Sequence, residues 1–266
     1  MRSILVLTVA LVACGQAMQE PAPPVVTLPE GTMVDLSHPY DESTIYWPTA
    51  EGFELQVDFE GMTDQGYYYA ANTFSTAEHG GTHIDAPIHF AEGRNTVDEI
   101  PLEQLIGHAV MIDVSDRSAD DSDYLISTAD IERWETEHGL LPDGVIVLLR
   151  TGYEELWPDR IRYLGTDERG AEAVAKLHFP GLDPEAARWL VANRSISAIG
   201  LDTASIDFGQ STHFESHQVL FAADIPAFEN LTNLHRLPVT GFVVIALPMK
   251  IAGGSGGPLR VAAIIP

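Results

Sequence analysis

Short apolar runs recur along the chain and predict buried β-strands. Four runs are dominated by apolar residues and cover residues 108–113, 145–149, 196–201 and 241–247. Runs without alternation of apolar and polar positions are typical of strands that are covered on both faces. Helical signals lie between these runs. The alternation of strands and helices therefore predicts an α/β fold.

Two of the intervening helices have readable ends. Residues 127–130 (Ser-Thr-Ala-Asp) form a start signal, and Gly139 can end that helix. Asp183 is followed by Pro184, which suits an N-cap with proline in the first turn of a second helix. No repeat and no later linker interrupts the chain, so we expect residues 31–266 to form a single domain.

The first thirty residues are predicted to be a leader and a tether. Residues 1–14 combine a positive start with a short apolar run, and their end resembles a bacterial lipoprotein processing box with Cys14 as the lipidated residue. The apolar run is too short to span a bilayer. Residues 15–30 contain four prolines, which favours a flexible tether. We therefore expect an exported lipoprotein, anchored in the bacterial cell envelope on the periplasmic side. An ordinary secretory signal and a buried N-terminal strand are the alternatives.

The chain is strongly acidic. It holds 39 Asp and Glu residues against 14 Lys and Arg residues, which gives a net charge of −25. Nucleic acids and anionic membrane surfaces would repel such a chain, so neither is an expected partner. Contact with a membrane is expected only through the N-terminal lipid anchor.

The stretch from His79 to His89 carries the candidate chemistry. It reads His-Gly-Gly-Thr-His-Ile-Asp-Ala-Pro-Ile-His and holds three histidines and a carboxylate in eleven residues. Imidazole and carboxylate side chains suit zinc, manganese or iron. The glycines and the proline argue against one helix, so a tight turn followed by an extended run is expected. An extended run points His83, Asp85 and His89 to one face. A histidine-rich polar loop is the alternative.

The pattern His-x-Gly-Thr-His-x-Asp-x-Pro-x-His resembles the signature of the metal-dependent cyclase family, which contains bacterial kynurenine formamidases and isatin hydrolases. The resemblance continues at residues 200–207, His217, residues 229–231 and the Gly-rich tail at 250–260. It implies a narrower fold within the α/β class, a swivelling β/β/α domain-like barrel. It also implies assembly as a homodimer or homotetramer.

The first predicted metal ligands lie inside this motif. His79, His83 and Asp85 supply three protein ligands, which leaves a position open for water or substrate. Thr82 is expected to orient a ligand through its hydroxyl group, as groups behind a metal ligand commonly do.

The resemblance adds two ligands from later in the chain. It maps His217 and Glu229 onto the remaining metal-binding positions, with Asp85 and Glu229 as bridges between two ions. His213, four residues before His217, is the competing ligand. The resemblance to isatin hydrolases implies a single ion at this site, so the number of ions stays open. One or two Zn²⁺ or Mn²⁺ ions per chain are therefore expected.

Three side chains are predicted to act on the substrate. The resemblance assigns His89 an acid/base role, and an imidazole of near-neutral pKa can take a proton from water and return it to a leaving nitrogen. The alternative for His89 is a further metal ligand. Trp47 and Phe90 are the candidates for contacts with a substrate ring, and ordinary packing is their alternative.

The resemblance implies a metal-dependent hydrolase that cleaves C–N bonds other than peptide bonds in a small aryl amide. The leading hypothesis is an arylformamidase, which converts N-formylkynurenine to kynurenine and formate in tryptophan catabolism. Residues 157–159 and 178–181 look closer to the isatin hydrolase branch, so opening of a cyclic amide is an alternative. A lactonase or polyketide-type cyclase is another. The non-enzymatic alternative is a lipid-anchored metal-binding protein.

Overall fold

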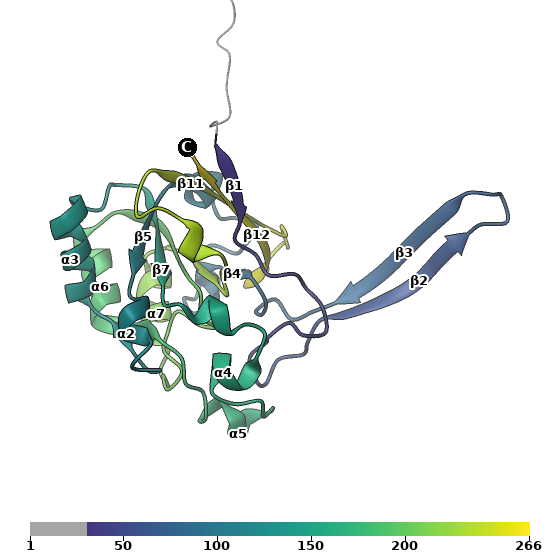
Figure 1. Ribbon diagram of the computed structural model, residues 1–266, viewed down its shortest axis with the longest axis horizontal. Coiled ribbons are helices and arrows are strands. Elements are labelled where there is room, and N and C mark those ends of the chain that lie inside the picture. The colour runs from purple at the N-terminus through teal and green to yellow at the C-terminus, as the bar shows by residue number, and fades with distance from the viewer. Residues whose placement is uncertain (1–30) are drawn as a thin grey trace, which may run out of the picture.

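A closed β-barrel with helices on its outside forms the body of the molecule (Figure 1). The computed structural model describes residues 31–266. The expected signal peptide with Cys14 and the expected tether lie outside the described residues, so the lipid anchor and the exported location stay predictions. Among the described residues, no helix has both the length and the apolar character needed to cross a membrane.

Seven strands close the barrel. In ring order they are β12 (Gly256–Ile265), β11 (Phe242–Pro248), β5 (Ile106–Asp113), β7 (Val145–Arg150), β9 (Ile196–Leu201), β10 (Ala227–Glu229) and β4 (His83–Asp85). The ring closes because β12 pairs with β11 on one side and, through its first residues, with β4 on the other. The β5, β7, β9 and β10 neighbours are parallel and the other pairs are antiparallel. An eighth strand, β1 (Thr32–Asp35), pairs with the far end of β12. This mixed barrel confirms the predicted single-domain α/β barrel.

Helices cover the outer face of the parallel strands. The α-helices are α1 (Leu102–Leu105), α2 (Ser115–Ser118), α3 (Thr128–His138), α4 (Arg160–Leu164), α5 (Ala171–Val174), α6 (Pro184–Asn193) and α7 (Glu215–Ala222). Three 3-10 helices are η1 (Pro87–His89), η2 (Tyr153–Leu156) and η3 (Leu234–Arg236), and a short parallel pair joins β6 (Leu125–Ile126) to β8 (Gly181–Leu182). Helices α3, α6 and α7 lie together on one side of the barrel (Figure 1).

The apolar strands separate two hydrophobic cores. In β7, Ile146 and Leu148 point into the barrel, whereas Val147 and Leu149 point outward to Trp134 of α3 and its neighbours. The four β7 side chains are fully buried. Burying one aliphatic side chain of this size contributes about 1.5–3 kcal/mol. A strand between two cores needs apolar residues at every position, which explains the uninterrupted runs in the sequence.

The predicted strands and helix ends are confirmed. Strands β5, β7, β9 and β11 cover the four apolar runs. Helix α3 begins after Ser127, whose backbone N–H donates to the Asp130 carboxylate at 2.8 Å, and ends at His138, directly before Gly139. Helix α6 begins after Asp183, whose carboxylate accepts from the backbone N–H of Glu185 at 2.9 Å.

The extended run through the histidine motif is shorter than predicted. Strand β4 ends at Asp85, and Pro87 begins the 3-10 helix η1, which ends at His89. The expectation that His89 shares an extended segment with His83 is therefore wrong, because the fixed φ of Pro87 suits the first turn of a helix.

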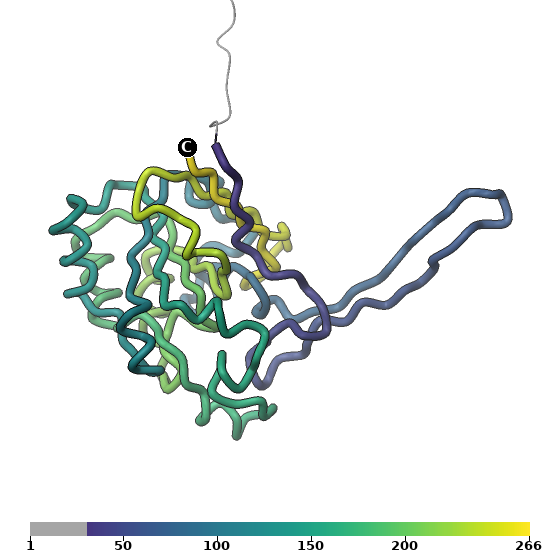
Figure 2. Tube along the Cα trace, viewed as in Figure 1, coloured from purple at the N-terminus to yellow at the C-terminus, as the bar shows by residue number. Residues whose placement is uncertain are grey.

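A long hairpin leaves the body of the molecule. Strands β2 (Glu54–Met62) and β3 (Tyr68–Ser75) pair with each other in a separate two-stranded sheet. Both views show this hairpin projecting far from the barrel (Figures 1 and 2). We call residues 54–75 the arm. No strand was predicted here from the sequence.

Candidate active site

Two short barrel strands place the candidate ligands opposite one another. Strands β4 and β10 pair so that His83 faces Glu229 across the antiparallel ladder. Between His83 and Asp85, the side chain of Ile84 points into the barrel core. Because strand side chains alternate, His83 and Asp85 share the other face. Gly81, with φ of 57°, makes the turn that leads into β4, and this backbone conformation favours glycine.

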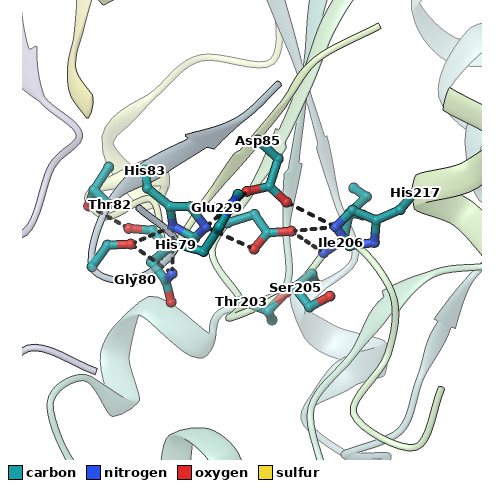
Figure 3. A network of polar contacts seen from close by, with 12 residues as sticks. His79, Gly80, Thr82, His83, Asp85, Thr203, Ser205, Ile206, His217 and Glu229 are labelled. Atoms are coloured by element: carbon teal, nitrogen blue, oxygen red, sulfur yellow. Dashed lines mark hydrogen bonds and ion pairs between the residues drawn. The ribbon is translucent and has the colours of Figure 1, made fainter. Parts of the chain in front are cut away.

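Four buried side chains meet at this point (Figure 3). The Nε2 atom of His83 lies 3.1 Å from Asp85 Oδ1 and 3.5 Å from Glu229 Oε2. The Nε2 atom of His217, from α7, lies 3.1 Å from Asp85 Oδ2 and 3.2 Å from Glu229 Oε1. Each carboxylate therefore turns one oxygen toward His83 and the other toward His217. We call these four residues the carboxylate–histidine cluster.

Hydrogen bonds orient both imidazoles of the cluster. The Nδ1 atom of His83 lies 2.9 Å from the carbonyl oxygen of Gly81, and Nδ1 of His217 lies 2.5 Å from Asp207 Oδ2. Asp207 also accepts from the backbone N–H groups of Ser216 and His217, at 3.0 and 3.2 Å. Acceptors at Nδ1 hold the proton there, so Nε2 of a neutral ring presents its lone pair to the carboxylates.

His79 is oriented in the same way from a different segment. Its Nε2 atom lies 2.9 Å from Ser255 Oγ, and the Ser255 hydroxyl donates to Glu78 Oε2 at 2.6 Å. The Ser255 hydroxyl has one proton, which it donates to Glu78, so it accepts a hydrogen bond from the Nε2–H group of His79. The Nδ1 atom of His79 faces Asp85 Oδ1, 2.6 Å away, so it donates to this carboxylate when the ring is protonated and presents its lone pair when the ring is neutral. Gly256 allows this approach, since a Cβ there would lie 2.6 Å from the ring of His79.

The cluster brings two carboxylates and two imidazoles together in a buried place, and their pKa values shift as a result. Burial raises the pKa of Glu229, and the charge of Asp85 raises it further. Burial also opposes ionisation of Asp85, but the charge of His79 and hydrogen bonds from His217 and His79 hold its pKa well below the usual range. Burial lowers the pKa of His217, yet its hydrogen bonds to Asp207, Asp85 and Glu229 raise it well above the usual value.

The chemistry of the donor set fits a divalent cation. Imidazole lone pairs that face carboxylate oxygens repel them unless a proton or a cation lies between. In the described part of the chain, no lysine or arginine lines this cavity to balance the two carboxylates. Two groups have ligand atoms close enough to share an ion, His83 with Asp85 and Glu229, and His79 with Asp85 and His89. Asp85 belongs to both groups, so the residues suit one ion or a pair.

His89 lies at the edge of the cluster. Its ring stacks on His79 with the centroids 3.8 Å apart. Burial lowers the pKa of His89 to about 4, because the Asp85 charge that raises it is opposed by His79, His217 and His83. The lowered pKa keeps the His89 ring uncharged at neutral pH and makes it a weaker base than the near-neutral imidazole expected from the sequence. Its acid/base role and its alternative role as a ligand both stay predictions.

The cluster forms the floor of a cavity of about 290 Å³ with aromatic walls. Trp47, Phe90 and Phe214 line it, together with His89. Phe90 packs on the ring of His217 with centroids 4.7 Å apart, and Phe214 lies between Trp47 and Phe90, at 6.1 and 5.4 Å. The two aromatic residues predicted to contact a substrate thus lie on the same cavity as the predicted ligands. Their contact with a substrate stays a prediction.

Other predicted residues have different places. The Thr82 hydroxyl donates to the backbone carbonyl of Asn230 at 2.7 Å and accepts from the N–H of His38 at 2.9 Å. Its hydrogen bonds therefore join the turn before His83 to the residue after Glu229, and its role in orienting a ligand stays a prediction. His213 is exposed, whereas His217 is buried in the cluster.

Several side chains that shape this site have no role predicted from the sequence. They are Glu78, Asp207, Phe214, Asn230 and Ser255. Asp207, Asn230 and Ser255 lay in segments that carried the family resemblance, which was the only available signal for them. Phe214 has none, although its φ of 52° is unusual for a bulky residue and marks a constrained position.

Comparisons with known proteins agree with this site. The family model described as "Putative cyclase" matches residues 34–208. The chain belongs to the cyclase family. The isatin hydrolase of Roseibium aggregatum is 33% identical to this cyclase-family chain over 209 residues, which make up 76% of this chain and 77% of the relative. The kynurenine formamidase of Salinibacter ruber is 25% identical, over 86% of this chain and 95% of the relative.

A solved structure supports the same assignment. Isatin hydrolase A from Labrenzia aggregata, bound to benzyl benzoate, has a TM-score of 0.79 and 34% identity to the cyclase-family chain, and the match covers 88% of this chain and 93% of that one. The predicted family and the predicted enzyme class, a hydrolase, are confirmed. The predicted ligands stay predictions that the buried cluster supports.

Proposed function

We propose that this amide hydrolase of the cyclase family opens the ring of a cyclic aryl amide of the isatin type. The similarity to an isatin hydrolase, at 33% identity, exceeds the 25% identity to a kynurenine formamidase, which supports ring opening over the formamidase reaction that the sequence analysis put first. Formamidase activity is the second candidate. It is favoured by the presence of both His217 and Glu229 in the cluster, the two positions that the resemblance took from the formamidases.

One observation carries the proposal. The uncharged imidazole of His89 lines the same aromatic cavity as the carboxylates of Asp85 and Glu229. A proton acceptor therefore lies beside a site that can bind a cation, under walls that suit a flat apolar ring.

The reaction needs a proton to be moved twice. Water adds to the amide carbonyl, so that a C–O bond forms and the C–N bond breaks. An imidazole nitrogen of His89 accepts the proton of the attacking water and returns it to the departing nitrogen. An aryl amine leaves poorly as an anion, so this protonation removes the main barrier to departure. The products are an aryl amine and a carboxylate, still joined in one molecule when the substrate is cyclic.

The predicted ligands His79, His83, Asp85, His217 and Glu229 would hold one or two Zn²⁺ or Mn²⁺ ions. A divalent cation supplies polarisation of the carbonyl and a lower pKa for water. The chain itself supplies the orientation of the ligands, through the hydrogen bonds to Gly81, Asp207 and Ser255.

The cavity is expected to select by shape. Trp47, Phe90 and Phe214 present ring faces and edges, which stack favourably with an aryl substrate. The volume of about 290 Å³ is at the small end of ligand pockets, which suits a fused two-ring compound.

The test is hydrolysis of isatin and of N-formylkynurenine by the purified protein, with and without chelator, while bound metal per chain is counted. We expect chelator-sensitive loss of isatin at a higher kcat/KM than that of N-formylkynurenine. The opposite order would move the function to the formamidase. Bound metal with turnover of neither compound would contradict the proposal and direct the search to lactones. The control variant is His213→Ala, which changes an exposed histidine near the cluster.

A further inference from the structure

The turn that leads to the predicted ligand His83 is fixed through the backbone of Gly81. The Gly81 N–H donates to the carbonyl of Ile45 at 2.9 Å. The Gly81 carbonyl accepts from Nδ1 of His83 at 2.9 Å and from Nδ2 of Asn230 at 2.8 Å. A carbonyl oxygen has two lone pairs, so these two donors fill it. The direction of the His83 ring therefore depends on how Asn230 holds this carbonyl.

Asn230 joins the two segments that carry predicted ligands. It directly follows Glu229, and its backbone carbonyl accepts from the Thr82 hydroxyl at 2.7 Å. Its backbone N–H donates to the carbonyl of Thr203 at 2.9 Å. Asn230 is buried, and its φ of 54° is a left-handed conformation that asparagine adopts more readily than most residues. Both the backbone and the side chain of one buried residue thus hold the turn before His83.

The hydroxyl of Tyr163 fixes which way the Asn230 amide faces. The hydroxyl oxygen lies 2.8 Å from Asn230 Oδ1 and 3.0 Å from the backbone carbonyl of Asp202. Because the Gly81 carbonyl can only accept, the NH₂ group of Asn230 faces that carbonyl and Oδ1 faces Tyr163. Burial and the charges of Asp202 and Glu229 hold the pKa of Tyr163 well above its usual value. The hydroxyl therefore keeps its proton and remains a donor to Asn230.

Packing fixes the ring that carries this hydroxyl. Tyr163 lies in α4 and is fully buried, and the ring of Trp157 meets it edge-on with centroids 5.4 Å apart. The buried apolar residues packed around it are Ile45, Tyr153, Leu164, Leu177 and Phe179. Ile45 also supplies the carbonyl that accepts from Gly81. The same apolar cluster therefore supports the turn before His83 from two directions.

We propose that Tyr163 is a positioning residue for the metal site and that it acts through Asn230. The Tyr163 hydroxyl holds the Asn230 amide, and the amide holds the Gly81 carbonyl. That carbonyl keeps Nε2 of His83 directed toward the two carboxylates of the carboxylate–histidine cluster. A ligand that is oriented before the ion arrives loses less freedom on binding, so the affinity for the ion is higher. This inference rests on the metal site of the proposed function and is independent of the substrate.

Titration of the metal-free protein with Zn²⁺ and Mn²⁺ tests the role of the hydroxyl. Tyr163→Phe keeps the ring and removes the donor that fixes Asn230, so we expect metal affinity to fall roughly 10-fold. The matched control is Tyr153→Phe, which removes a hydroxyl from the same apolar cluster. Tyr153 donates to the carbonyl of Ser122 at 3.4 Å, and neither residue lines the cavity. We expect the control to bind metal like the parent. A Tyr163→Phe protein that has a lower Tm but binds metal as tightly as the control would overturn the proposal.

A double-mutant cycle tests the route through Asn230. Asn230→Gly removes the side chain without straining the backbone, because glycine adopts a φ of 54° readily. If Tyr163 acts through Asn230, then Asn230→Gly/Tyr163→Phe binds metal as weakly as Asn230→Gly alone. Losses of affinity that add would contradict this route.

The visible absorption spectrum of the Co²⁺-loaded protein gives a second readout, because it reports the arrangement of ligands around the ion. We expect Tyr163→Phe to change this spectrum and Tyr153→Phe to leave it as in the parent. Identical spectra for the two variants would count against the proposal. A parent that binds none of these ions would overturn the proposal together with the metal site, whereas metal binding without hydrolysis of isatin would count against the proposed function alone.

Discussion

Asp207 is predicted to set the affinity of the site for metal through its hydrogen bond to His217, although it is not itself a predicted ligand. In Asp207→Asn, one carboxylate oxygen becomes an NH₂ group. In the parent, one Asp207 oxygen lies 2.5 Å from His217 Nδ1 and the other accepts from the backbone N–H of Ser216 at 3.0 Å. If the amide oxygen of the variant takes the first position, its NH₂ group faces the N–H of Ser216. If the amide turns over, the NH₂ group faces the N–H of His217. Either orientation sets donor against donor.

The size of the effect follows from the buried position. Asp207 is fully buried, so the lost hydrogen bond to a charged group costs about 1.5–3 kcal/mol. Part of this energy holds His217 with its Nε2 lone pair toward Asp85 and Glu229, so we expect metal affinity to fall roughly 10- to 100-fold. The loss of the remaining hydrogen-bond energy lowers the free energy of unfolding.

The assay is titration of the metal-free protein with Zn²⁺ and Mn²⁺, followed by calorimetry, together with thermal unfolding. The matched control is Asp183→Asn, which makes the same chemical change at the N-cap of α6, where asparagine is an equally good cap. We expect its metal affinity to equal that of the parent. If Asp207→Asn binds metal as tightly as the control does, then His217 is not a ligand, or Asp207 does not orient it.

The other predictions concern the cluster and the cavity. His89→Ala should keep the bound metal and lose roughly 10²- to 10⁴-fold in kcat, measured against His213→Ala; an equal loss of metal would show that His89 is a ligand. Removal of metal should lower the Tm on the order of 5–10 °C, because Asp85 and Glu229 then repel each other in a buried site; an unchanged Tm in calorimetry would refute a structural contribution from the ion. Phe214→Ala should raise KM for an aryl substrate about 10-fold with a small change in kcat, and an unchanged KM would exclude Phe214 from the substrate wall.

The local elements could be predicted because their causes are local. The apolar runs, the start signal at residues 127–130 and the Asp183 cap each act within a few residues, and the structure confirms them. His79, His83 and Asp85 could be named for the same reason, since one turn and one short strand bring them together. The end of the extended run was placed too late, because Pro87 suits an extended segment as well as the first turn of a helix, and it begins η1 here.

The assembly of the site depended on the closure of the barrel. Glu229 faces His83 only because β10 pairs with β4, although 146 positions separate them, and the residues alone left His217 and His213 as competitors. The family resemblance chose His217, and the fold of α7 shows why that residue is the buried one.

The sequence by itself determined the elements and the motif, because helix caps, apolar runs and closely spaced ligands act over a few residues. Only the tertiary structure decided which distant groups orient the ligands, such as Asp207 and Ser255, and that residues 54–75 leave the barrel as a two-stranded arm. Such contacts depend on which strands pair and where the chain crosses between them, and no periodicity within a short segment encodes that.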